Sequence, residues 1–258
     1  MDNTQMTSEK KPVRFEGNYI QWIKSELAGW SAAPWSIFWF GVSFQLALFL
    51  MGTINLTTTI TFIATFFGLL CTVATAKGKS INGIMGFISA FGYIYVNWTA
   101  GHYASVLDQL VFVACIDLPL MFRWRTWGED MDAKIRRLGK MGWVGVTAAI
   151  LALWAVLFPI YNALHDTQPL VDSLVLAIGA TASILMLFHV GNLMQLWIVS
   201  NGINIVLWFL ALQAGYSQSS LPMLVVMCAY MASALYGAFF SVWSKKYFKK
   251  INNGNTTK

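Results

Sequence analysis

Residues 192–208 have the sequence NLMQLWIVSNGINIVLW, which contains no Lys, Arg, Asp or Glu, and the apolar run continues to residue 212. A helix that crosses the roughly 30 Å hydrocarbon core of a bilayer needs about 20 mostly apolar residues. The stretch therefore predicts a transmembrane helix over residues 192–212. Its two central asparagines, Asn201 and Asn204, would lie near the middle of the membrane.

The rest of the chain has a similar composition. Of its 258 residues, 57% are hydrophobic and 11% are charged, whereas soluble domains carry about 25% charged residues. We therefore expect an all-α integral membrane protein whose main solvent is the lipid bilayer, since a barrel would show shorter, alternating strands. Eight transmembrane helices are predicted, at residues 34–53, 56–76, 81–98, 103–122, 143–163, 170–189, 192–212 and 221–243.

The basic residues set the topology. Loops rich in Lys and Arg stay in the cytoplasm, and eight spans with a cytoplasmic N-terminus place all 17 Lys and Arg on that side. We expect a multi-pass protein of the bacterial inner (plasma) membrane with both termini in the cytoplasm. Because the basic residues are confined to loops and tails, the net charge of +6 indicates topology and not nucleic-acid binding.

The basic loop at residues 123–141 separates spans two to four from spans six to eight. Spans two to four and spans six to eight have the same orientation, with the fifth span as the inverter between them. Parallel repeats of this kind are a known plan of membrane transporters.

Polar side chains inside spans are costly, so they indicate function first. In the seventh span, Trp197, Asn201, Asn204 and Trp208 recur at spacings of four, three and four residues, which places them on one helical face. They lie near the bilayer midplane, the usual depth of a transporter's substrate site, and are candidate substrate contacts. Alternatively, the asparagines only link helices through hydrogen bonds and the tryptophans only pack.

The third span repeats this pattern in weaker form. Asn82, Ser89, Tyr93 and Asn97 share one face with Gly86. Ser89, Tyr93 and Asn97 are predicted substrate contacts, and Asn82 is a predicted supporting residue. The small residues of this span could equally form a helix-packing face.

Acidic and amide residues mark the fourth and sixth spans. Gln109 is a further predicted substrate contact, while Asp108 and Asp172 are predicted to gate or support the site. Alternatively, Asp172 is a hydrogen-bonded residue of a first helical turn, where an acid interacts well with the helix dipole. Asp117 is expected to form an ion pair with the arginines that follow the fourth span.

The sequence shows no enzymatic site. His102, His165 and His189 lie at span ends and never one helical turn from one another or from a carboxylate, so no metal site is expected. No nucleotide-binding loop or Ser-His-Asp grouping can be proposed. The three cysteines lie in apolar runs and are expected to be small buried side chains. We expect a protein that is not an enzyme and has no cofactor.

Segments in both halves resemble the PnuC family of nicotinamide riboside transporters. They are GLLCTVATAKGKSINGIMGFIS (68–89), YASVLDQLVFV (103–113), VDSLVLAIGATASILM (171–186) and QLWIVSN (195–201). The most specific element is a WxxxN motif, here Trp197 and Asn201, preceded by Asp172 and Ser173 at family-like spacing. The first half departs from the family, because Ser89 stands where an asparagine is expected.

The resemblance implies a SWEET-like core of three helices, a linking helix and three more, assembled as a homotrimer. One extra helix would precede this core. The predicted segments are 1–33 (cytoplasmic), 34–55 (extra transmembrane helix), 56–122 (first repeat), 123–169 (cytoplasmic loop and linker helix), 170–243 (second repeat) and 244–258 (cytoplasmic basic tail).

The resemblance also implies uptake of nicotinamide riboside, a form of vitamin B3 and an NAD precursor, by facilitated diffusion. A separate cytoplasmic nicotinamide riboside kinase would trap the ligand. The flat pyridinium cation suits aromatic faces, which Trp197 and Trp208 would supply. Amides both donate and accept hydrogen bonds, and Asn201, Asn204 and Gln109 would meet the carboxamide and ribose.

Three alternatives stay open. The first is a PnuC-like transporter of another vitamin such as thiamine, which is also an aromatic cation. The second is an intramembrane enzyme, which would need a dyad or a metal cluster at one depth, and the sequence shows neither. The third is a scaffold whose polar face only packs helices.

Overall fold

The computed structural model describes residues 15–126 and 137–244, and within these ranges every regular element is a helix. The helices are α1 (Tyr19–Leu27), α2 (Ala32–Met51), α3 (Leu56–Ala76), α4 (Asn82–Ala100), α5 (Tyr103–Phe112), the π-helix η1 (Val113–Asp117), α6 (Leu118–Phe122), α8 (Lys140–Ala163), α9 (Pro169–Leu187), α10 (Leu193–Ala214) and α11 (Ser220–Phe240). The all-α prediction is confirmed. Parts of the predicted N-terminal segment, basic loop and basic tail lie outside the described residues.

Local sequence explains where several helices begin and end. Asn55 caps α3, because its side chain accepts a hydrogen bond from the N–H of Thr58, a donor without a partner inside the helix. α4 ends at Gly101 and α10 at Gly215, with φ of 76° and 69°. Glycine adopts this left-handed conformation without a steric penalty. The second long helix of each predicted half thus ends in the same way.

Seven helical segments of the described part are long and apolar enough to cross a membrane. They are Ala32–Met51, Leu56–Ala76, Tyr103–Phe122, Lys140–Ala163, Pro169–Leu187, Leu193–Ala214 and Ser220–Phe240. Each corresponds closely to a predicted span. The remaining predicted span, 81–98, is α4, a helix of 19 residues that asparagine, serine and threonine make less apolar. Its crossing of the membrane stays a prediction.

The structure contains two elements that the sequence analysis did not predict. A capping box of Asn18 and Gln21 starts the short helix α1 ahead of the first span, and α1 packs Trp22 against Trp124. The span over residues 103–122 contains the π-helical turn η1. Pro119 follows this turn, and a proline inside a helix removes one of its backbone hydrogen bonds.

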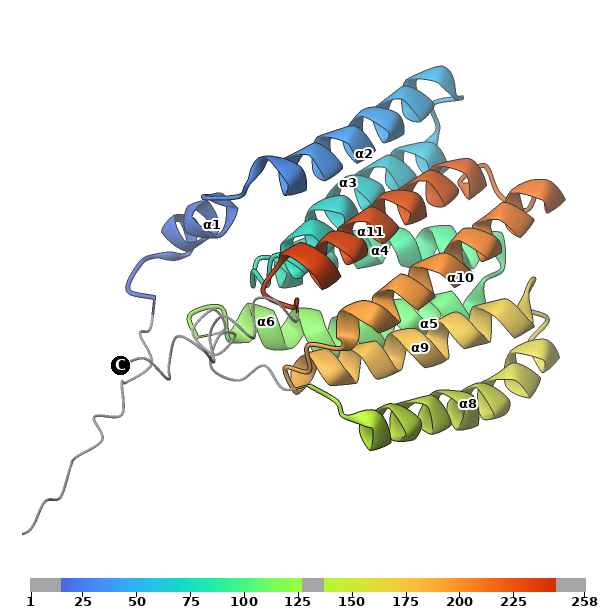
Figure 1. Cartoon of the computed structure of the whole chain (residues 1–258). Coiled ribbons are helices and arrows are strands. Elements are labelled where there is room, and N and C mark those ends of the chain that lie inside the picture. Colours follow the sequence, from blue (N-terminus) through green and yellow to red (C-terminus); the bar gives the residue numbers. More distant parts are fainter. Residues whose placement is uncertain (1–14, 127–136, 245–258) are drawn as a thin grey trace, which may run out of the picture.

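The helices form a bundle in which α2 and α8 lie on opposite sides (Figure 1). α11 packs against α2, α3 and α10, and α9 packs against α5, α8 and α10. α8 fully buries only Ile150 and Tyr161, so most of its residues face outward although one side of it packs against α9. The centre of the bundle is formed by α3, α4, α5, α9, α10 and α11.

Candidate functional site

A cavity of about 130 Å³ lies among these six central helices. All eight predicted substrate contacts line it, together with the predicted supporting residue Asp108. The eight are Ser89, Tyr93, Asn97, Gln109, Trp197, Asn201, Asn204 and Trp208. The fold therefore brings the polar faces of α4 and α10 to one space, while ligand binding by these residues stays a prediction.

The two tryptophans of α10 have different surroundings. Trp208 is only 1% exposed, and its ring meets the imidazole of His102 edge-on, with the ring centroids 5.0 Å apart. Trp197 is half-buried, and its ring centroid lies 5.9 Å from that of Phe112. The indole Nε1 of Trp197 has no hydrogen-bond partner among the described residues. Trp208 is thus part of the protein core, whereas Trp197 keeps an unused donor.

The amide side chains in the cavity keep hydrogen-bonding capacity. Asn97 and Asn204 each donate from Nδ2 to the backbone carbonyl four residues earlier, at 2.8 and 3.1 Å. Asn201 and Gln109 line the cavity and make no side-chain hydrogen bond within the described part of the chain. Since an amide offers two donors and an acceptor, this set can pair with a ligand that carries hydroxyl and carboxamide groups.

Two tyrosines connect α4 to α11 across the cavity wall. Tyr93 and Tyr230 form a hydrogen bond between their hydroxyl groups. Gly68 of α3 lies against the pair, because a Cβ atom at this position would overlap both phenol oxygens. The glycine therefore leaves the space in which the two hydroxyls meet.

Asp108 is an acid in the middle of the bundle. Its carboxylate rests against Gly179 of α9, where a Cβ atom would overlap a carboxylate oxygen. It forms no ion pair or hydrogen bond with any residue that the structure describes. No Lys, Arg or His is among the described residues that line the cavity. Asp108 is the only acidic residue in this described lining.

The other two predicted supporting residues do not line the cavity. Asn82 is fully buried in the first turn of α4, and its side-chain atoms have no partner within residues 15–126 and 137–244. Asp172 accepts hydrogen bonds from the backbone N–H of Ser105 at 3.2 Å and from the Ser105 hydroxyl. Its contacts match the alternative of a hydrogen-bonded first-turn acid, and they join α9 to α5.

The predicted ion pair of Asp117 is wrong. Asp117 is 0% exposed, and neither carboxylate oxygen has a partner in the described chain. Its carboxylate lies against Gly86 of α4, so it faces the inside of the bundle. Arg123 and Arg125 follow the end of α6 and are exposed. Nearness in sequence to the arginines therefore does not produce an ion pair, because the side chain of Asp117 points toward α4.

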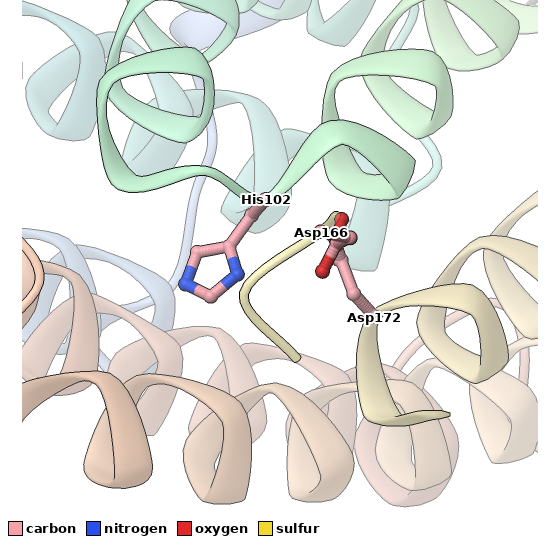
Figure 2. Close-up of side chains that lie close together, drawn as sticks. All are labelled: His102, Asp166 and Asp172. Atoms are coloured by element: carbon pink, nitrogen blue, oxygen red, sulfur yellow. The ribbon is translucent and has the colours of Figure 1, made fainter. Parts of the chain in front are cut away.

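His102, Asp166 and Asp172 lie close together (Figure 2), where α4 joins α5 and where α9 begins. One potential ligand atom of each lies within 4.8 Å of the others, a set of donor types that can hold a zinc ion. The sequence analysis missed the cluster, because its members come from three separate segments. Asp166 already accepts hydrogen bonds from the N–H groups of Tyr103 at 2.7 Å and Ala104 at 3.3 Å.

These carboxylates therefore cap α5, whose first N–H groups have no partner inside the helix. His102 lies between α4 and α5, and its Nδ1 shares a hydrogen bond of 3.0 Å with the Thr167 hydroxyl. Burial lowers the pKa of His102 from 6.5 to about 4, against the opposing attraction of Asp166. Because the imidazole is neutral and both carboxylates already accept hydrogen bonds from α5, the cluster acts as a helix cap.

Residues of α3 and α11 also line the cavity, and the sequence analysis did not predict them. They include Cys71, Thr72, Thr75, Met223, Met227, Tyr230 and Ser233. Cys71 was predicted only as a small buried side chain, and it is 4% exposed. A signal was present in α3, where the lining positions 68, 71, 72, 75 and 76 follow the three- and four-residue spacing of one helical face. The same prediction is wrong for Cys228, which is exposed.

Known proteins similar to this chain are transporters. A family model described as "Nicotinamide mononucleotide transporter" matches residues 58–245. The nicotinamide riboside transporter PnuC of Neisseria mucosa is 27% identical over 235 residues, which cover 88% of this chain and 86% of that protein. The protein of the same name from Haemophilus influenzae is 27% identical over 240 residues, which cover 86% and 95%.

A solved structure has the same fold. The crystal structure of the vitamin B3 transporter PnuC matches with a TM-score of 0.73 and 24% sequence identity, covering 92% of this chain and 99% of that one. Together with the family match, the similarity includes every helix that lines the cavity.

Proposed function

The chain belongs to the nicotinamide mononucleotide transporter family, and from this premise we propose that it carries nicotinamide riboside across the membrane. The resemblance to the PnuC family is confirmed. The named relatives are transporters and not enzymes, in agreement with the prediction for this chain.

One observation favours the nucleoside over the mononucleotide. No Lys or Arg is found among the described residues that line the cavity, and Asp108 adds an acid. A phosphate group is usually held by arginine, lysine or several backbone N–H groups. A phosphorylated ligand would meet a carboxylate and no cation here. The ligand proposed from the charge of the cavity is therefore the nucleoside.

The side chains of the cavity have roles that suit this ligand. The half-buried Trp197 would stack on the pyridinium ring, where a cation over an aromatic face is attracted by the ring quadrupole. Asn201, Asn204 and Gln109 would pair with the carboxamide and the ribose hydroxyls. Trp208 would support this surface from the core. A site that pairs each ligand hydroxyl discriminates against analogues without it, because the protein groups would be left unpaired.

The finer architecture is part of the same proposal. α4 would be the third of eight spans. α2 would be the extra N-terminal helix, and α8 the linker between two three-helix repeats at 56–122 and 170–243. The matching glycine ends of α4 and α10 support the repeats. The outward-facing surface of α8 leaves room for subunit contacts in a homotrimer.

The mode of transport is also a proposal. We place the protein in the bacterial inner membrane with both termini in the cytoplasm, because this topology collects the basic residues on one side. Uptake would proceed by facilitated diffusion, and a separate cytoplasmic kinase would trap the nucleoside by phosphorylation.

Calorimetric titration of the purified protein in detergent tests the proposed ligand. Nicotinamide riboside should bind with saturation, nicotinamide mononucleotide should not, and Trp197→Ala should weaken the binding. Trp98→Ala is the matched control, because Trp98 is 63% exposed and does not line the cavity. Binding of thiamine alone would assign the protein to another vitamin, and binding of the mononucleotide alone would contradict the argument from charge.

A further inference from the structure

We infer that Asp108 supplies a negative charge by which the cavity selects a positively charged aromatic ligand over a neutral one of the same shape. This inference rests on the proposed function and assigns a specificity-determining residue to its site. Asp108 would recognise the charge of the ligand, whereas the aromatic and amide side chains would recognise its shape and its hydrogen-bonding groups.

The position of Asp108 allows it to act on a ligand directly. Asp108 is on α5 and lines the cavity together with its neighbour Gln109 and with Trp197. Gly179 of α9 has no side chain where a Cβ atom would overlap the Asp108 carboxylate. The glycine thus leaves room for a carboxylate at this depth of the bundle.

Other intramembrane acids of the described chain differ from Asp108. Asp172 is 0% exposed, and Ser105 donates to its carboxylate from both the backbone and the hydroxyl. Asp117 is also 0% exposed and does not line the cavity. Asp108 alone among these three lines the cavity, and its carboxylate has no ion pair or hydrogen bond within the described residues.

A carboxylate in this environment favours a cation as its partner. An acid inside a membrane protein is costly unless it is paired with another charge or with hydrogen-bond donors. The described lining of the cavity contains no Lys, Arg or His that could pair with Asp108. A pyridinium ligand brings the missing positive charge, and opposite charges attract more strongly in the low-polarity interior of a protein than in water. A neutral ring leaves the carboxylate unpaired.

The test compares two ligands that differ in charge alone. Nicotinamide riboside has a positively charged ring nitrogen, and benzamide riboside has a carbon atom at that position and is neutral. The affinity of the wild-type protein, measured by calorimetry, should favour nicotinamide riboside by about tenfold or more, which corresponds to at least about 1.4 kcal/mol. Asp108→Asn keeps the size of the side chain and should reduce this preference to roughly threefold or less.

Asp117→Asn is the matched control, because it neutralises an acid of the same span that does not line the cavity. It should keep the wild-type preference. Gly179→Ala is a second variant, in which the added methyl group displaces the Asp108 carboxylate, and it should also reduce the preference. Size-exclusion chromatography identifies variants that fold.

The outcomes separate this inference from the proposed function. Wild-type protein that binds nicotinamide riboside, with a preference that Asp108→Asn and Gly179→Ala leave unchanged, would overturn the role of Asp108 and keep the proposed function. Equal weakening of both ligands would assign Asp108 a structural role and also overturn the inference. Wild-type protein that binds thiamine in place of nicotinamide riboside would overturn the ligand, and the same comparison with the neutral deazathiamine would then decide the role of Asp108.

Discussion

Replacing Trp208 by alanine should destabilise the protein, whereas replacing Trp197 by alanine should mainly weaken ligand binding. The two residues belong to one face of α10, but Trp208 is 1% exposed and Trp197 is half-buried. Truncating a buried aromatic residue in a soluble core costs about 3–5 kcal/mol. In a membrane, part of this cost disappears because lipid is as apolar as the core, while the packing loss remains.

We therefore expect Trp208→Ala to lower the free energy of unfolding by about 2 kcal/mol. A loss of this size lowers the melting temperature of a chain of this length by about 4–8 °C. Trp197→Ala should change the melting temperature by no more than about 2 °C, since part of its side chain already faces the cavity.

Thermal unfolding in detergent, followed by size-exclusion chromatography, measures the first effect, and titration with nicotinamide riboside measures the second. Trp98→Ala is again the control, because its exposed ring should affect neither. Equal melting temperatures for Trp208→Ala and Trp98→Ala would refute the assignment of Trp208 to the core. A melting temperature of Trp197→Ala as low as that of Trp208→Ala would refute the distinction between the two tryptophans.

Gly68→Ala should lower the affinity for nicotinamide riboside by about tenfold, because the added methyl group displaces the hydroxyls of Tyr93 and Tyr230; an unchanged calorimetric affinity would contradict this. The protein should be most stable above pH 6.5, and its free energy of unfolding should fall as the pH is lowered toward 4. The reason is that burial lowers the pKa of His102 from 6.5 to about 4. In this window the unfolded chain binds a proton that the folded chain does not, so the loss approaches about 3 kcal/mol. His102→Gln should remove this dependence of the melting temperature on pH, and an unchanged slope would exclude His102 as its cause. Asp166→Ala should lower the free energy of unfolding by about 1 kcal/mol, because it removes a cap of α5. Asp166→Asn should lower it less, because the amide oxygen still accepts hydrogen bonds from the helix. Equal melting temperatures for the two variants would argue against capping.

Much of the fold follows from the sequence, because a transmembrane helix is defined locally. Its length is set by the bilayer and its hydrogen bonds lie within the segment. The spans at 56–76 and 103–122 were predicted with the limits that the structure has. α4 was predicted as a span, and its polar residues explain why its composition resembles a membrane helix less than those of the other spans.

The candidate site was predictable only where helical periodicity reveals it. The faces of α4 and α10 combine polar and aromatic residues at helical spacing, and both line the cavity. The lining face of α3 has the same spacing, but its glycine, cysteine and threonines resemble ordinary packing residues of a membrane helix. The η1 turn within residues 103–122 also left no clear mark in the hydropathy of the sequence.

The sequence by itself determined the all-α membrane class, most of the helical segments and the polar faces of α4 and α10. Each of these depends on residues that are neighbours within a single helix. Only the tertiary structure decided which faces meet. It joined His102, Asp166 and Asp172 from three segments, turned Asp117 away from its neighbouring arginines, and placed Asp108 against Gly179 at the cavity. Such contacts depend on how separate helices pack, and no pattern within a single helix records its neighbours.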